Sequence, residues 1–293
     1  MEGNLLELLG FDAREKLLII HADDVGMCHS VNEASFERLL DGGVSSASIM
    51  VPCPWLLEAI DFFRCETGLD VGVHSTLTSE WRYYKWRPLT GAKGLSTKNG
   101  FMWPTVKDVA FRATAEEVEA EIEAQVKLLL ENGVNISHLD THMGTVYSRP
   151  NYLERYVNLA LKYKILPMVP NPRPEIEEYA RRQGLPIDEL KKVMSRAPIL
   201  LDKFLPGLPP GTVEDKKRVL MAFLKSLEPG SINQVIVHLG LDTYELKWII
   251  GEGYKERYYE YLLVNEKSVK KVIDEQGIRL IGWKDLLKIL EKG

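Results

Sequence analysis

Short runs of apolar and β-branched residues alternate with amphipathic stretches along the whole chain. Apolar runs of about four to eight residues between turn residues are typical of buried strands, and apolar residues spaced three or four positions apart are typical of helices. We predict strands near residues 17–22, 44–51, 69–77, 134–141, 165–169, 198–202, 233–239 and 278–282. We predict helices near residues 30–41, 54–66, 115–132, 150–163, 174–183, 186–195, 213–227, 258–275 and 283–291.

This alternation predicts an α/β fold with mostly parallel strands, because a helix between two strands carries the chain back to the start of the sheet. Eight candidate strands are spread over all 293 residues. Such a distribution favours a closed or nearly closed (β/α) barrel, similar to a TIM barrel, over two separate domains. We therefore expect a single domain over residues 1–293.

Residues 78–114 interrupt the alternation and form an expected insertion. Its aromatic residues have no clear period: Trp81, Tyr83, Tyr84, Trp86 and Trp103. A loop of this length is usually functional or disordered, and the aromatic density argues against disorder. Three interpretations stay open: a small core under a loop, a subunit interface in a homo-oligomer, and a platform for sugar rings with Trp81 and Trp86 as candidate contacts.

The composition indicates a soluble globular protein without nucleic-acid or membrane partners. Apolar residues make up 45% and charged residues 27% of the chain, the formal charge is −5 and the pI is near 5.8. Nucleic-acid binders usually present a basic face, and no apolar stretch here reaches the length of a membrane span. The three cysteines lack a CxxC spacing and the N-terminus lacks a basic targeting segment, so we expect a cytoplasmic location.

Polar side chains end several of the predicted strands. These are Asp23 and Asp24 after the first strand, His74 late in the third, His142 after the fourth and His238 at the end of the seventh. Because the carboxyl ends of parallel strands gather on one face of an α/β fold, we expect these side chains to converge. A helix cap or an Asx turn would also explain the Asp-Asp pair taken alone.

Two imidazoles and one carboxylate are a common ligand set for Zn²⁺, Fe²⁺ or Co²⁺. Such an ion polarises a carbonyl oxygen and lowers the pKa of a water molecule. A second carboxylate would then serve as general base, and a histidine across the pocket as general acid. The residues thus indicate one divalent metal ion, with Zn²⁺, Mg²⁺, Co²⁺, Fe²⁺ and Ni²⁺ all open.

Three further polar residues lie inside predicted strands. His138 is more simply explained as a core residue than as a metal ligand. Asp140, two residues before His142, is a candidate for orienting an imidazole. His21 could line the pocket, although packing explains it equally well.

At these residues the chain resembles the YdjC-like (ChbG-type) carbohydrate deacetylases. The resemblance rests on His21–Gly26 with Val31-Asn32, Gly72–Thr78, His138–His142, Val237-His238 and Gly277–Trp283, in family order. Three positions depart from the common family pattern: Val25 stands in place of Phe, Gly144 in place of a further His, and Leu239 in place of Pro.

The resemblance implies a distorted (β/α) barrel that binds a divalent metal and removes acetyl groups from N-acetylated amino sugars or oligosaccharides. It also implies roles for single residues. Asp24, His74 and His142 look like metal ligands, Asp23 like the general base on the attacking water, and His238 like the acid that protonates the departing amine. We therefore expect a metal-dependent hydrolase that acts on a small soluble carbohydrate.

Two other functions stay open. The same ligands could serve a sugar or sugar-phosphate isomerase, an epimerase or a phosphoesterase on a barrel, although no Gly-rich phosphate loop is visible. A non-catalytic carbohydrate-binding protein with a structural metal is less favoured, because structural zinc normally has four protein ligands and often Cys.

Overall fold

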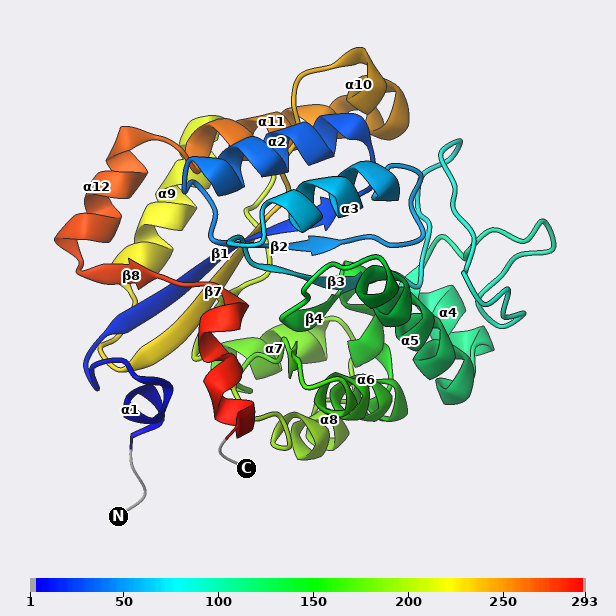
Figure 1. Ribbon diagram of the computed structural model, residues 1–293, viewed down its shortest axis with the longest axis horizontal. Coiled ribbons are helices and arrows are strands. Elements are labelled where there is room, and N and C mark those ends of the chain that lie inside the picture. Colours follow the sequence, from blue (N-terminus) through cyan, green and yellow to red (C-terminus); the bar gives the residue numbers. More distant parts are fainter. Residues whose placement is uncertain (1–3, 292–293) are drawn as a thin grey trace.

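A curled parallel sheet forms the centre of the molecule, described for residues 4–291 in a computed structural model (Figure 1). Its strands in chain order are β1 (Lys16–Val25), β2 (Ser46–Ile49), β3 (Val71–Ser75), β4 (His138–Thr141), β5 (Leu166–Pro167), β6 (Lys203–Leu205), β7 (Ser231–Val237) and β8 (Ile278–Leu280). The spatial order is β5-β4-β3-β2-β1-β7-β6, and every pairing is parallel. All carboxyl ends therefore lie at one end of the sheet.

The sheet curls until its two edges meet. A parallel bridge between Pro170 and Leu201 joins the segment after β5 to the segment before β6. The barrel is distorted at its last strand. In a regular barrel β8 would lie between β7 and β1, but here β7 pairs directly with β1. Instead β8 lies beside Lys16–Leu18, and β2 lies beside the later residues of β1. The predicted distorted (β/α) barrel is confirmed.

Helices surround the curled sheet on its outer face, with α2, α3, α9, α11 and α12 against one part of it and α5 to α8 against another (Figure 1). Their bounds are α1 Leu5–Leu9, α2 His29–Leu40, α3 Leu56–Cys65, α4 Val106–Arg112, α5 Ala115–Glu131, α6 Pro150–Lys162, α7 Pro174–Arg182, α8 Ile187–Met194, α9 Val213–Lys225, α10 Tyr244–Ile250, α11 Tyr254–Leu263 and α12 Lys267–Glu275. Within residues 4–291 the 3₁₀-helices are η1 His142–Ser148, η2 Gly251–Gly253 and η3 Trp283–Glu291. None of the helices between residues 4 and 291 is long and apolar enough to span a membrane.

The structure differs from the predicted elements where local backbone chemistry overrides periodicity. The single helix predicted over 258–275 is two helices, α11 and α12, because Glu266 between them has an extended backbone with φ −63° and ψ 135°. The strand predicted over 198–202 lies later, at β6, and Leu201 forms only the closing bridge. Neither α4 nor α10 is predicted, because helices of 7 residues are too short for a clear period.

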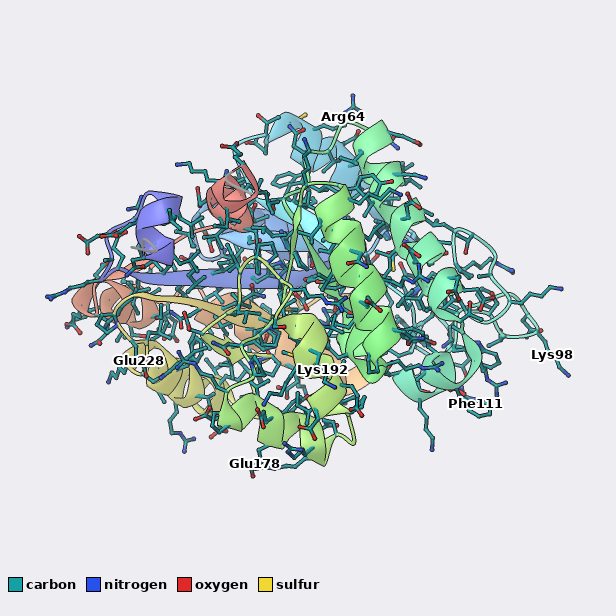
Figure 2. The ribbon with its side chains drawn as sticks, turned by 90° about the horizontal axis from the view of Figure 1, so that it is seen from below. Arg64, Lys98, Phe111, Glu178, Lys192 and Glu228 are labelled. Carbon is teal, nitrogen blue, oxygen red and sulfur yellow. The ribbon has the colours of Figure 1, made fainter. Side chains whose placement is uncertain are left out.

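The aromatic insertion, residues 78–114, lies beside the carboxyl ends of β1 and β2 (Figure 1). It carries the short helix α4 and an antiparallel bridge between Ser96 and Met102, so it is not all loop. Lys98 and Phe111 mark its outer part and point away from the sheet (Figure 2). Trp86, also within this segment, is buried in a small core with Met27, Met50 and other apolar residues.

Candidate active site

A bulge at the end of β1 turns two neighbouring carboxylates toward one pocket. Ala22 pairs with Ala47 and Val25 with Ile49, so β1 uses one more residue than β2 over this step. Asp24, inside the bulge, has a φ of +69°, which is uncommon for a residue other than glycine. Successive side chains of a regular strand point to opposite faces, whereas a bulge re-aims them. Adjacent acids can therefore both face the pocket.

Asp24, His74 and His142 form a tight triad at the carboxyl ends of β1, β3 and β4. Asp24 Oδ1 lies 3.3 Å from His74 Nε2 and 3.3 Å from His142 Nδ1, and the two ring nitrogens are 3.3 Å apart. All three residues are buried. Within residues 4–291, Asp24 Oδ1 forms no well-aligned hydrogen bond, although it is shielded from solvent.

This triangle fits a divalent metal ion. Ligands held about 2.1 Å from an ion lie roughly 3.0 to 3.4 Å from one another in octahedral and tetrahedral arrangements. The three separations of 3.3 Å fall within that range. A bound ion would also satisfy the buried Asp24 oxygen, which otherwise costs free energy. The triad leaves coordination positions for water and substrate.

Each member of the triad is held through its remaining polar atom. Arg257 donates to Asp24 Oδ2 at 2.5 Å. His74 Nδ1 lies 2.7 Å from Asp140 Oδ1, and His142 Nε2 lies 3.1 Å from Glu80 Oε2. Carboxylates that accept the second ring proton direct the other nitrogen toward a metal, a common arrangement around metal-binding histidines.

The charges around the triad favour a cation. Burial alone lowers the pKa of His74, but the charges of Asp140 and Asp23 outweigh it and raise this pKa well above its usual value. Burial likewise opposes the charged form of His142, and Glu80 with Asp24 raises its pKa to about 9. A divalent ion can replace the imidazole protons that this negative surrounding stabilises.

Replacing Glu80 tests whether the partner of His142 supports metal binding. The Glu80→Gln change keeps an acceptor beside His142 Nε2 but removes the negative charge, so we expect divalent-metal affinity to fall about 10- to 100-fold. Titration calorimetry on chelated protein measures it. Glu33→Gln is a matched control, because Glu33 lies 3.4 Å from His29 Nε2 at a partly exposed ion pair. Equal affinities in both variants would contradict the role of Glu80.

Asp23 lies beside the triad, and His238 lies beside Asp23. Asp23 Oδ1 accepts a hydrogen bond from His21 Nδ1 at 2.9 Å. Its other oxygen, Oδ2, lies 3.8 Å from His74 Nε2 and 3.9 Å from His238 Nε2. Asp23 is buried, whereas the His238 side chain is 36% exposed at the pocket rim. One nearly buried carboxylate and one accessible imidazole thus lie side by side next to the triad.

A buried ion pair holds the backbone at His238. The backbone N–H of His238 donates to Glu260 Oε2 at 2.7 Å, and Glu260 Oε1 lies 2.8 Å from Lys216 Nζ. The Lys216 side chain, on α9, is only 1% exposed and also contacts Glu256 at 2.8 Å. Helices α9 and α11 thereby fix the end of β7.

Removing the lysine from this pair should destabilise the protein. Lys216→Met leaves Glu260 buried without its counter-charge, and we expect the free energy of unfolding to fall by about 3–5 kcal/mol. Urea unfolding measures the loss. Lys217→Met is the matched control, because Lys217 forms a more exposed pair with Glu266 at 2.7 Å and should cost less than about 1 kcal/mol. Equal losses in the two variants would refute the anchoring role.

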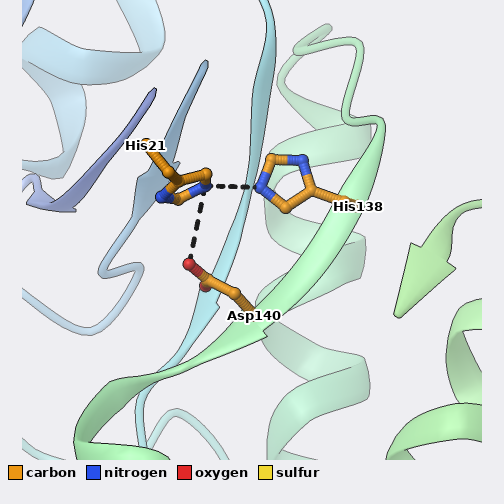
Figure 3. Close-up of side chains that lie close together, drawn as sticks. All are labelled: His21, His138 and Asp140. Carbon is orange, nitrogen blue, oxygen red and sulfur yellow. Dashed lines mark hydrogen bonds and ion pairs between the residues drawn. The ribbon is translucent and has the colours of Figure 1, made fainter. Parts of the chain in front are cut away.

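His21, His138 and Asp140 form a second buried cluster (Figure 3), which contacts the triad where Asp140 meets His74. The Nε2 atoms of His21 and His138 are 2.8 Å apart, and His21 Nε2 lies 3.6 Å from Asp140 Oδ2. Burial raises the free energy of the charged imidazoles, yet the hydrogen bond to Asp23 and the charge of Asp140 raise the pKa of His21. Burial and His21 lower the pKa of His138 to about 4.

The two candidate tryptophans occupy different environments. Trp86 is buried, donates from Nε1 to the Thr78 carbonyl at 2.7 Å, and packs with its ring centre 6.4 Å from that of His142. Trp81 is partly buried, and its Nε1 forms no hydrogen bond within the described chain, residues 4–291. Trp86 therefore supports the wall of the pocket, and Trp81 is the one left with an unused polar atom.

Sequence reasoning missed Glu80 and Arg257. Glu80 follows the motif Gly72–Thr78 by two residues, and that proximity was the available signal. Arg257 lies on α11, 233 positions from the Asp24 that it contacts. A charged residue in a helix rich in charged residues carries no mark of burial, so no local pattern identifies it.

The barrel and its buried triad define a class: a (β/α)-barrel protein with a His₂Asp triad suited to a divalent metal, next to a second carboxylate and an accessible imidazole. Comparison with known proteins gives the family. The chain belongs to the YdjC-like protein family, whose sequence model matches residues 17–275. The resemblance read from the motifs is confirmed.

Individual relatives agree with this assignment over nearly their whole length. A carbohydrate deacetylase of Thermus thermophilus is 32% identical over 277 residues, covering 93% of this chain and 94% of the relative. A chitooligosaccharide deacetylase of Yersinia enterocolitica is 25% identical and covers 92% and 99%. The fold matches a solved structure from Enterococcus faecalis, of a candidate cellobiose-phosphate cleavage protein, with a TM-score of 0.75 at 24% identity, covering 93% and 99% of the two chains.

Proposed function

We propose that this protein is a metal-dependent hydrolase that removes acetyl groups from N-acetylated amino sugars or their oligosaccharides. The observation that carries the proposal is the placement of Asp23 between the Asp24–His74–His142 triad and His238, 3.8 Å from His74 Nε2 and 3.9 Å from His238 Nε2. The names of the Thermus thermophilus and Yersinia enterocolitica relatives support the same chemistry.

The roles of the residues follow from their positions. Asp24, His74 and His142 would hold a divalent ion, which would supply Lewis acidity toward the acetyl carbonyl and the attacking water. Asp23 Oδ2 accepts the proton of the attacking water, since Oδ1 is already bonded to His21. His238 Nε2 donates a proton to the amide nitrogen as the C–N bond breaks, which releases the free amine and acetate.

The charge of the pocket favours an acetamide over a phosphate. Carboxylates of Asp23, Asp24, Glu80 and Asp140 lie on or next to the two histidines, and the guanidinium of Arg257 is already bonded to Asp24. A neutral acetamide brings no charge that needs a partner, whereas a phosphate would need a cation besides the metal ion, and Arg257 is already paired with Asp24. The phosphoesterase alternative is therefore disfavoured.

The metal and the compartment are part of the proposal. Imidazole and carboxylate ligands accept Zn²⁺, Co²⁺, Fe²⁺ or Ni²⁺, and Mg²⁺ with less preference for nitrogen. Cys28 and Cys53 are buried free thiols and Cys65 is an exposed one. Free thiols suit a reducing compartment, which supports the expected cytoplasmic location.

A substrate panel tests the proposed reaction. Chelated protein is supplied with one of the five metals and with N-acetylglucosamine, N,N′-diacetylchitobiose or the 6-phosphates of glucosamine and N-acetylglucosamine. We expect metal-dependent acetate release from at least one acetylated sugar and no inorganic phosphate. Phosphate release, or isomerised sugar without acetate, would contradict the proposal.

A further inference from the structure

A chain of buried polar contacts leads from Asp23 away from the pocket. Asp23 Oδ1 lies 2.9 Å from His21 Nδ1, and His21 Nε2 lies 2.8 Å from His138 Nε2 (Figure 3). His138 Nδ1 then lies 2.8 Å from Ser137 Oγ. His21 and His138 are fully buried, in β1 and β4. Buried polar groups in such a chain are costly unless all are satisfied, and here each has its partner.

The end of this series of contacts that lies farthest from Asp23 is hydrogen-bonded to the backbone. Ser137 Oγ donates to Asp70 Oδ1 at 2.7 Å. Asp70 also accepts the backbone N–H groups of Trp283 and Lys284, at 2.8 and 2.9 Å, at the start of η3. The Trp283 ring stacks on His138 with ring centres 5.4 Å apart. The series of contacts therefore ends at the amino ends of β3 and β4, opposite the carboxyl ends that carry the triad.

The direction of each hydrogen bond between Asp70 and Asp23 can be assigned consistently. An ionised Asp70 only accepts, so the Ser137 hydroxyl proton lies toward Asp70 and Ser137 Oγ accepts from His138 Nδ1–H. Neutral His138 then accepts at Nε2, and the shared proton belongs to His21. His21 donates its other N–H to Asp23. The raised pKa of His21 and the lowered pKa of His138 agree with this assignment.

The same residues do not fit a second metal ion. The two Nε2 atoms are 2.8 Å apart, shorter than the roughly 3.0 to 3.4 Å expected between ligands of one ion. There is also no room, because a Cβ placed on Gly72 would lie 2.6 Å from His138 Nε2, so the β3 backbone packs directly on the ring. A proton fits between these nitrogens, and an ion does not.

We propose that His21 and His138 are positioning residues that hold the Asp23 carboxylate with Oδ1 bonded and Oδ2 free toward the pocket. The inference rests on the proposed function, in which Asp23 Oδ2 takes the proton of the attacking water. Without the second imidazole, His21 loses its acceptor and can turn, and Asp23 loses its fixed orientation. The geometry of proton transfer then degrades, while the metal ligands and the binding surface stay unchanged.

The first test compares two replacements of His138. His138→Leu removes the acceptor of His21, whereas His138→Gln offers a carbonyl oxygen near the position of Nε2. We expect the leucine variant to lose about 10- to 100-fold in kcat, with KM for N,N′-diacetylchitobiose and metal affinity within about twofold of wild type. The glutamine variant should recover most of the loss. Asn233→Leu is the matched control, because Asn233 is buried in the same barrel and its side-chain amide bonds Leu17 and Ser231, away from the Asp23–His21–His138 contacts.

Wild-type kcat in a folded His138→Leu variant, or an equal kcat loss in Asn233→Leu, would overturn the positioning role. A rise in KM that accounts for the whole loss would overturn it too. If the unaltered protein releases no acetate from any sugar, the proposed function fails, and that failure is distinct from these outcomes.

A second test needs no activity. Histidine ¹⁵N spectra of the metal-loaded wild type should show both ring nitrogens of His21 protonated and Nε2 of His138 unprotonated. His138→Gln keeps His21 doubly protonated if the arrangement is correct. An unprotonated His21 nitrogen in the wild type, or two bound zinc ions per chain by elemental analysis, would refute the hydrogen-bonded pair.

Discussion

Asp24→Asn should abolish metal binding and reduce acetate release by at least about 10³-fold, since losing the ion removes several kcal/mol of transition-state stabilisation. The neutral amide cannot provide the charge that offsets a divalent ion. It also leaves the buried guanidinium of Arg257 without its counter-charge, so we expect lower thermal stability as well. Elemental analysis after dialysis and an acetate assay measure the two effects.

The control for this change is Asp242→Asn, at an exposed ion pair with Lys247. It should leave metal content, activity and melting temperature unchanged. A full equivalent of metal in dialysed Asp24→Asn protein would show that the Asp24–His74–His142 triad is not the metal site.

Asp23→Asn, in contrast, should leave the metal content unchanged. Asp23 lies beside the triad but contacts His21 through Oδ1, so we expect the variant to keep one metal ion per chain. General-base catalysis contributes about 10²- to 10⁴-fold, and kcat should fall by that amount. Steady-state kinetics with metal analysis of the same sample check both parts.

The conclusion from Asp23→Asn depends on both measurements together. Unchanged deacetylation with metal still bound would remove Asp23 as the base. Loss of the metal would instead make Asp23 a ligand, and the division of roles between the two neighbouring acids would be wrong.

The convergence of Asp23, Asp24, His74 and His142 could be predicted from the sequence because it depends on one rule. Each of these residues ends or closely follows an apolar run, and parallel strands bring their carboxyl ends together. The barrel followed from the same alternation of strands and helices. The bulge that lets both acids face the pocket could not be predicted, because a positive φ at Asp24 leaves no trace in a pattern of apolar positions.

The supporting contacts could not be predicted either, since they join distant parts of the chain. Arg257 contacts Asp24 from 233 positions away, and His138 contacts His21 from 117. The sequence favoured a core role for His138, and the structure places it in the core while bonding it to the residue that holds Asp23. Burial and function are therefore not alternatives at this position.

The most direct test of the account is a metal titration that follows binding and reaction together. Chelated protein receives increasing amounts of the metal that is most active in the substrate panel, with bound ion and acetate release from N,N′-diacetylchitobiose measured at each step. We predict that activity rises in proportion to bound metal and stops at one ion per chain, and that Asp24→Asn shows neither binding nor activity. Full activity in the chelated protein, or activity that requires a second ion, would contradict the account.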